Sequence, residues 1–518
     1  MRRSPLRRTL PYNMLNLNKA TEESEKEGGD TALDYPNAQA ILPLPPSLPD
    51  DVTQAFTDLL GDSQVPLKGA LRTARLIEEQ FLADGWPSSR RYGGEAELAR
   101  RYHAGEAMIR EAIRILEARG TAKMRTGRNA NLIVTAPPLE QLYDGMQTYC
   151  SLLGVSDAEI VTAQTILDCA AARIAIDRLS KGPIARFEAE QLRVDNQDWR
   201  TWLLRLASNP SITFYANCVE ELHGSLRYAD AFIHKPLPSP DQEGRLEQLR
   251  EAVLDGDVDA TRECVVGFAV VSAAADRTCN AIGHVPDNSR LPQNNKRALQ
   301  IVADLLGSLE PGQWRDGTFI GNEADLCVRY DVDRRSLRQA IRVLEASQVA
   351  LTVPGRGNGL MACTPKPASF SRLICCHFAA SEISRFFVFD TFEALSIETV
   401  TYIASRAGAP TAAAPAGRIG FILESCKDNP RLHAKIEDQQ FALAGNPLLE
   451  LFLRSARAYN SLGGIGKLPP TAHDVSGLSE CLHQLAKALA SHDPTAAANA
   501  QARKCAIVRK HLKKAEIF

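Results

Sequence analysis

The sequence contains one segment twice, at a constant offset of 228 residues and without a gap. The charged and apolar positions from Glu95 to Tyr102 recur from Glu323 to Tyr330, and those from Arg110 to Ala118 recur from Arg338 to Ala346. Residues outside the helical patterns that also match at this offset are Trp86, Gly93 and Arg128. Amphipathic helices alone do not explain such matches. A unit this long is a domain rather than a solenoid repeat, so we expect two related halves.

Composition places the chain among globular proteins. It has 518 residues, of which 44% are hydrophobic and 24% charged, and no apolar run approaches the roughly 18 residues that span a bilayer. The basic N-terminus lacks the apolar stretch of a secretory signal. The 12 cysteines are scattered and indicate reduced thiols. We therefore expect a cytoplasmic protein with no membrane partner.

Each copy of the repeat has the pattern of two short helices followed by a hairpin. Ile109, Ala112, Ile113 and Leu116 fall at helical spacing and predict one buried stripe, which the second copy repeats from Leu337 to Leu344. A turn with Gly and Arg between two short extended segments follows in both copies and is typical of a hairpin tip. This order indicates a winged helix-turn-helix domain.

A winged helix-turn-helix domain suits double-stranded DNA, because a helix N-terminus fits the major groove and a basic loop reaches phosphates. Asp333 is predicted to cap the third helix of the second copy, which puts Arg334 and Arg335 on its first turn. The first copy has Glu106 at the leading position, so the copies are expected to bind DNA unequally. The candidate DNA-binding residues are Arg334, Arg335, Ser336, Arg338, Arg342, Arg356 and Gly357 in the second copy, and Arg110, Arg114, Arg125 and Arg128 in the first.

The sequence resembles the GntR family of transcriptional regulators, of the FadR type. The residues that carry the resemblance are 94–99 and 109–120 in the first half, and 337–346 and 354–357 in the second. The resemblance implies a winged-helix DNA-binding domain followed by an all-helical effector-binding domain, in regulators that act as dimers. It also implies a small-molecule effector, such as an organic acid or another metabolite.

The expected fold is mainly α, with two winged helix-turn-helix domains that carry small β-wings and are each followed by an all-helical effector-binding domain. The expected segments are a disordered tail at 1–65, winged helix-turn-helix domains at 66–136 and 296–364, helical domains at 138–280 and 366–516, and a linker at 281–295. We call the two winged-helix segments head one and head two.

Many members of the resembled family bind a divalent metal through an Asp, a His one turn later and two further His. The matching positions here are Asn196, Arg200, Leu246 and Phe268 in the first half, and His433, Glu437, Leu482 and Lys504 in the second. We expect no metal and no other cofactor. His433 and Glu437 are the candidates that remain, although a pair at this spacing is more often a surface contact.

The sequence thus predicts a DNA-binding transcriptional regulator whose two heads act as a pseudo-dimer on a pseudo-palindromic site. A homodimer of the whole chain is the other arrangement left open. The alternative function is a ligand-sensing or protein-interaction module whose heads no longer read DNA, which Glu106 and the balance of 60 basic and 62 acidic residues favour. An enzyme is not expected, because the sequence contains no nucleophile-base arrangement or paired acid and base.

Overall fold

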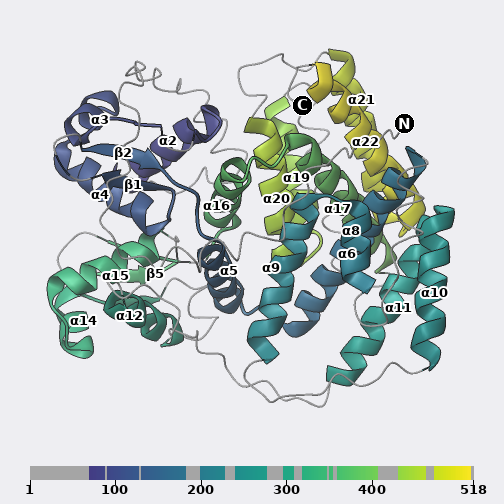
Figure 1. Ribbon diagram of the computed structural model, residues 1–518, viewed down its shortest axis with the longest axis horizontal. Coiled ribbons are helices and arrows are strands. Elements are labelled where there is room, and N and C mark those ends of the chain that lie inside the picture. The colour runs from purple at the N-terminus through teal and green to yellow at the C-terminus, as the bar shows by residue number, and fades with distance from the viewer. Residues whose placement is uncertain are drawn as a thin grey trace, which may run out of the picture. The chain divides into compact units, whose positions relative to one another are not determined.

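A computed structural model describes the chain over residues 69–87, 90–125, 127, 130–182, 199–227, 240–276, 296–308, 318–346, 349–353, 359–363, 365–406, 430–462 and 472–514. All of these residues belong to one unit, Pro46–Phe518. The described part is mostly helical with small sheets, as expected (Figure 1). The predicted tail at 1–65 and the predicted linker at 281–295 lie outside the described residues.

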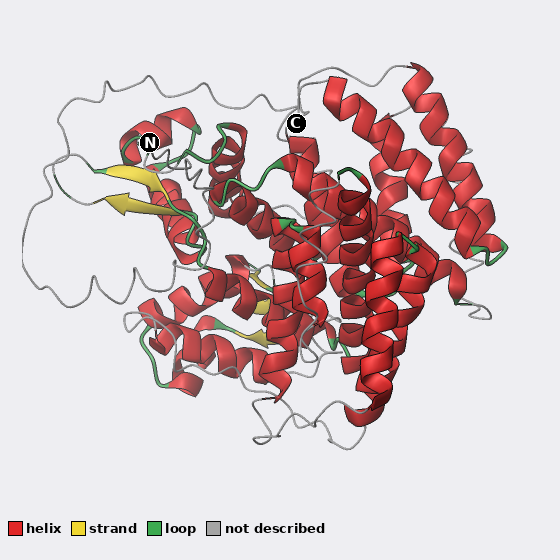
Figure 2. Cartoon of the chain, turned by 45° about the vertical axis from the view of Figure 1, so that its right-hand side comes forward, coloured by secondary structure: helices red, strands yellow, loops and turns green. Residues whose placement is uncertain are grey.

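Head one contains three helices and a two-stranded sheet. The elements are α2 (Gly69–Ala83), α3 (Glu95–Arg101), α4 (Glu106–Ala118), β1 (Ala122–Arg125) and β2 (Asn131–Val134). The predicted stripe of α4 is confirmed, because Ile109, Ala112, Ile113 and Leu116 are all buried. The two strands pair antiparallel with Ala122 opposite Val134. They form the hairpin drawn as the pair of yellow arrows at the upper left of Figure 2.

Head two repeats this order and adds a third strand. The elements are α12 (Lys296–Gly307), β3 (Phe319–Gly321), α14 (Glu323–Tyr330), α15 (Arg334–Ala346), β4 (Ala350–Thr352) and β5 (Leu360–Ala362). The equivalent stripe of α15, from Leu337 to Leu344, is also buried. Strand β5 pairs with both β3 and β4. The sequence did not predict β3, because three residues are too few to show alternation.

The elements of the two heads begin at matched positions of the repeat. Helices α3 and α14 start at Glu95 and Glu323, and α4 and α15 start at Glu106 and Arg334, each pair 228 residues apart. Head one contains an isolated bridge between Arg91 and Ile133 where head two has the pairing of β3 with β5. The described secondary structure therefore follows the sequence repeat.

A helical region follows each head, in agreement with the predicted helical character of 138–280 and 366–516. The first region has α5 (Leu139–Leu153), α6 (Asp157–Ser180), α8 (Trp199–Ala207), α9 (Pro210–Arg227), α10 (Pro240–Asp255) and α11 (Val258–Asp276). The second has α16 (Pro367–Ala380), α17 (Arg385–Ser405), α19 (Pro430–Ala442), α20 (Pro447–Leu462), α21 (Ala472–Ala490) and α22 (Pro494–Lys514). Helix α6 begins at a capping box formed by Ser156 and Glu159.

Helices α6 and α17 are buried over most of their length and pack against each other. Each lies among the other helices of its own region, α8, α9 and α11 around α6, and α20 and α22 around α17 (Figure 1). No helix in the described ranges is both long and apolar enough to cross a membrane. Every cysteine of the described ranges is a free thiol, as the scattered spacing predicted.

Candidate nucleic-acid interface

The N-terminus of α15 has the cap that the sequence predicted. Asp333 accepts a hydrogen bond from the backbone N–H of Ser336 over 2.9 Å. Hydrogen bonds from Ser336 lower the pKa of the Asp333 carboxyl below its ordinary value. Arg334 and Arg335 follow the cap with exposed side chains, and neither forms an ion pair with a residue that the structure describes. The first turn of α15 therefore combines two guanidinium groups with the positive end of a helix dipole.

The N-terminus of α4 has the opposite charge. The helix begins at Glu106, which is exposed, and the preceding Gly105 supplies no side-chain cap. Arg110 lies 3.8 Å from the carboxylate of Glu106 and 3.5 Å from that of Glu95. The cation nearest the first turn is thus paired with two acidic groups, so this end of α4 is a poor partner for phosphate.

One ion pair recurs in both heads. Arg338 on α15 lies 3.0 Å from Glu323 at the start of α14, and these residues match Arg110 and Glu95 at the repeat offset. In both heads the pair ties the third helix to the second. Because Arg110 and Arg338 remain about half exposed, they can hold the helices together and still reach a ligand at the surface.

The third helices of the two heads contact each other. Glu111 of α4 forms an ion pair with Arg342 of α15 and also accepts a hydrogen bond from Arg114 over 3.5 Å. A pocket of 210 Å³ lies at this contact, lined by Glu111, Arg342 and Arg338 among others. Arg342 and Arg114 were predicted as DNA contacts, and the structure places both at the acidic side chain between the heads.

Glu111 was missed by the sequence reasoning, although a signal for it existed. Its match in the repeat is Gln339, so the acidic group is present in only one copy. A difference between two otherwise similar helices marks a position where the copies have separate roles. Here that role is to join α4 to α15.

The hairpins carry the remaining predicted residues. Arg125 is exposed at the end of β1, whereas Arg128, Arg356 and Gly357 lie outside the described residues. Two further exposed cations of head one, Arg91 and Lys123, were not predicted.

The positions matched to the family's metal ligands in the first half are engaged in other contacts. Arg200 donates a hydrogen bond to buried Asp168 over 2.8 Å, and Phe268 stacks on Trp199 at 5.0 Å between ring centroids. Burial raises the pKa of Asp168, an effect that Arg200 opposes. Leu246 is buried, and Asn196 lies outside the described residues.

In the second half Glu437 is held by cations. Lys504 donates to its carboxylate over 2.8 Å, and Arg457 lies 3.5 Å away. Burial acts to raise the pKa of Glu437, but Lys504 and Arg457 outweigh it and hold the pKa below its ordinary value. The side chain of His433 lies outside the described residues. Within the described ranges, no group of three or more His, Cys, Asp and Glu side chains is placed to hold a metal ion.

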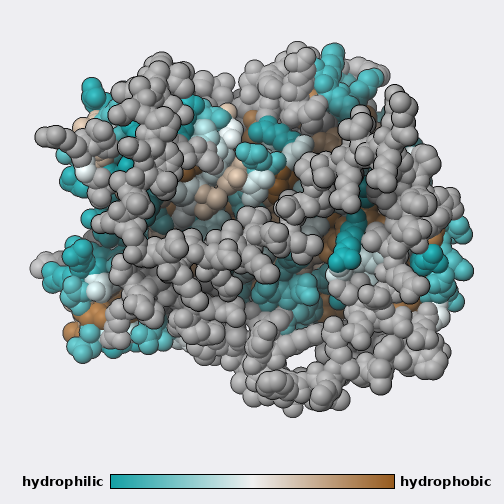
Figure 3. All heavy atoms as spheres, viewed as in Figure 1, coloured by the Kyte–Doolittle hydropathy of each residue, from teal (hydrophilic) through white to brown (hydrophobic). Residues whose placement is uncertain are grey.

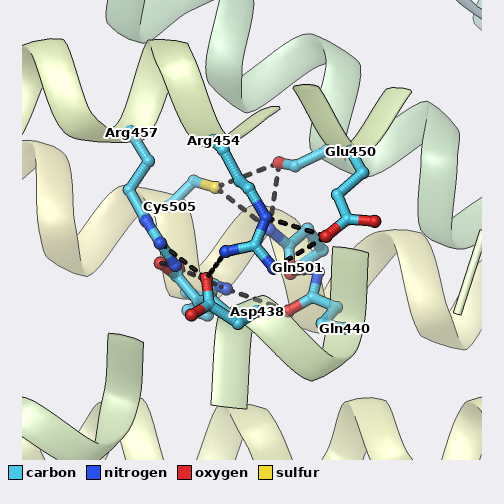
Figure 4. Close-up of polar contacts among 10 residues, drawn as sticks. Asp438, Gln440, Glu450, Arg454, Arg457, Gln501 and Cys505 are labelled. Carbon is cyan, nitrogen blue, oxygen red and sulfur yellow. Dashed lines mark hydrogen bonds and ion pairs between the residues drawn. The ribbon is translucent and has the colours of Figure 1, made fainter. Parts of the chain in front are cut away.

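A network of polar side chains extends from Glu437 between α19, α20 and α22. Asp438 accepts from Arg457 over 2.6 Å and lies 2.5 Å from Arg454, which also bonds Glu450. Figure 4 shows Arg454 between Asp438 and Glu450, with Gln501 and Cys505 close by. Ion pairs between side chains therefore hold this part of the second helical region together.

The two helical regions exchange reciprocal hydrogen bonds. Asn209 caps α9 and donates to the carbonyl of Phe387 over 2.9 Å, while Asn446 caps α20 and donates to the carbonyl of Glu159 over 2.7 Å. Phe387 and Glu159 are each the third residue of their helices, α17 and α6. Equivalent residues thus make equivalent contacts in both directions.

Head one is also joined to the second helical region by a buried ion pair. Arg372 on α16 donates to Glu79 on α2 over 2.7 Å, and both side chains are almost fully buried. Burial raises the pKa of Glu79, and Arg372 opposes this shift. The matched positions of the repeat are Asp144 and Gly307, so head two has no equivalent pair.

No family model matches the chain, and no curated protein matches it. Two similar solved structures are GntR-family regulators. A GntR protein from Streptococcus agalactiae has 19% identity and a TM-score of 0.33, over 41% of this chain and 99% of that chain. A GntR-family transcriptional regulator from Pseudomonas syringae pv. tomato str. DC3000 has 21% identity and a TM-score of 0.15, over 44% of this chain and 96% of that chain. At TM-scores this low, neither likeness bears on function.

Proposed function

We propose that the chain is a sequence-specific DNA-binding transcriptional regulator built as a tandem GntR-type protein. The observation that carries this proposal is the first turn of α15, where Arg334 and Arg335 are exposed after a capped N-terminus. A guanidinium group can bind the O6 and N7 atoms of guanine in the major groove, and a helix N-terminus attracts phosphate. The three helices and small sheet of each head are consistent with a winged helix-turn-helix domain.

The two halves would act as a pseudo-dimer within one chain. The reciprocal bonds of Asn209 and Asn446 support this arrangement, because a two-fold interface uses the same surface on both partners. The second copy of the helical region then supplies the surface that a separate subunit would otherwise provide. A homodimer of the whole chain is the alternative to this arrangement. The proposed effector of the helical domains is an organic acid or another metabolite.

Selection of bound duplexes from random DNA by the purified full chain tests the proposed function. We expect enrichment of a defined sequence, with binding that weakens as salt increases because phosphate contacts release counterions. Loss of that preference in Arg334→Ala would tie it to α15. The proposal fails if no sequence is enriched and no duplex binds even at low salt.

A second candidate function is a ligand-sensing or protein-interaction module. The observation in its favour is the acidic N-terminus of α4, where Glu106 and Glu95 of α3 both pair with Arg110. A head of this kind would be repelled by phosphate. If this second function holds, the protein binds DNA negligibly. Replacement of Arg334 then leaves that affinity unchanged.

A further inference from the structure

The sheets of the two heads differ in charge at matched positions. In head one, Ile133 of β2 lies opposite Lys123 on one side and bridges to Arg91 on the other. Residues directly opposite in antiparallel strands share one face of the sheet. Arg125 is on the same face, because it lies two residues after Lys123 on β1. Head one therefore presents three exposed cations on one sheet face.

The same face of head two is apolar. Met361 of β5 lies opposite Leu351 on one side and Phe319 on the other, and the residue matched to Arg125 is Val353. Phe319 is 47% exposed, so the surface of head two keeps an apolar side chain where head one has Arg91. Brown atoms among teal ones at the lower left of Figure 3 mark a further apolar surface of head two, over α14 and not over this sheet face.

The third helices also differ in charge, but here the cations are in head two. Head two has Arg334 and Arg335 on the first turn of α15, and head one has Glu106 and Ala107 at the matched positions of α4. At these matched positions each head has cations on one of the two elements and not on the other. In head one the basic element is the sheet, and in head two it is the third helix.

We propose that the two heads divide a single DNA-binding task, so that the recognised site is asymmetric. The proposal rests on the proposed function and specifies its DNA. Head two reads base edges with Arg334 and Arg335, and head one holds phosphates with Arg91, Lys123 and Arg125. Phosphate contacts position a protein and carry no sequence information, whereas base contacts specify. The site then has one specific segment and one segment of any sequence.

Contacts within the chain favour action on one duplex. The ion pair between Glu111 and Arg342 holds α4 beside α15, and the buried pair between Arg372 and Glu79 fixes head one against α16. The two basic elements are therefore carried on helices and strands that are tied together. The reading helix and the phosphate-binding sheet can engage neighbouring parts of the same DNA.

The test compares two exchange variants of the full chain on the selected duplex and on a scrambled one. Lys123→Leu with Arg125→Val gives head one the residues of head two. We expect equal weakening on both duplexes. The negative slope of log affinity against log salt should fall in magnitude by about 2, at about 0.9 for each phosphate contact. Arg334→Ala with Arg335→Ala should weaken binding to the selected duplex by more than the roughly 5- to 150-fold expected for one base contact, and abolish the preference over the scrambled one.

Lys510→Leu is the matched control for lost charge, because Lys510 is exposed on α22, and it should leave both the slope and the preference unchanged. The selected motif itself should lack inverted symmetry. A palindromic motif with equal halves, or a sheet variant that alters preference at an unchanged slope, would overturn the division between heads while leaving the proposed function intact. Absence of salt-dependent binding to any duplex would instead overturn the proposed function, and this inference with it.

Discussion

The rings of Tyr215 and Phe452 stack with their centroids 4.5 Å apart, and each residue lies six positions after the Asn that caps its helix. Equivalent positions of the two halves therefore meet face to face. The hydroxyl of Tyr215 also lies 2.7 Å from the hydroxyl of Ser455. A contact between equivalent residues is what a two-fold axis between α9 and α20 produces.

We predict that Tyr215→Ala destabilises both helical regions together. The side chain is fully buried between α9 and α20, and truncating a large aromatic core residue costs about 3 to 5 kcal/mol. Calorimetry should show one transition at a lower temperature. Tyr459→Phe serves as a control, because the Tyr459 hydroxyl bonds Ile383 within the second region. Two separate transitions, of which only one shifts, would refute a shared core.

Arg334→Ala should weaken DNA binding by about 1 to 3 kcal/mol if the guanidinium group reaches a base edge. The matched control is Glu106→Ala, at the same position of head one. It removes a negative charge and should leave binding unchanged or slightly stronger. A fluorescence titration with the selected duplex measures both. Equal losses in the two variants would contradict the asymmetry between the heads.

Arg372→Met should destabilise the protein by about 3 to 5 kcal/mol, because it leaves the Glu79 carboxylate buried without its partner. Burial already raises the pKa of Glu79, and without Arg372 it rises further. Below its ordinary pKa, Glu79 is protonated and no charge is buried. The free energy of unfolding of the variant should therefore fall as pH rises through the raised pKa. Urea denaturation at mildly acidic and neutral pH measures this. Addition of Glu79→Gln should restore part of the stability at neutral pH, and a failure to do so would argue against the ion pair.

The pKa of Glu437 gives a prediction of opposite sign. Lys504 and Arg457 hold the pKa of Glu437 below its ordinary value. The stability that the Glu437 carboxylate contributes is therefore present at pH values above the ordinary pKa and is lost as pH falls through the lowered pKa. Lys504→Met should lower stability at neutral pH and reduce its further loss on acidification. Lys487→Met, at an exposed position of α21, is the control. Parallel pH profiles for the protein and Lys504→Met would show that Lys504 is not the partner that matters.

The final prediction is that the protein contains no near-stoichiometric zinc, manganese or nickel after gentle purification. Leu246 and Phe268 offer no lone pair to a cation, and Glu437 is occupied by Lys504. Elemental analysis decides the matter. Metal that disappears in a variant of His433 would contradict the prediction for the second half, and metal that survives it would place a site elsewhere.

The sequence by itself predicted features that depend on neighbouring residues. The stripe from Ile109 to Leu116 predicted the buried face of α4, and Asp333 predicted the cap of α15. Helical spacing and capping act within a few residues, so one stretch of sequence contains the whole signal. The repeat offset additionally predicted that both heads have the same order of elements.

Only the tertiary structure decided which distant side chains meet. Arg342, a candidate DNA-binding residue, pairs with Glu111, and the bond between Arg372 and Glu79 joins residues 293 positions apart. Strand β3 exists because β5 offers it a partner, since three residues cannot form a strand alone. Such pairings depend on how separate elements pack, and neither periodicity nor local spacing records that. The same packing connects the basic sheet of head one to the basic third helix of head two.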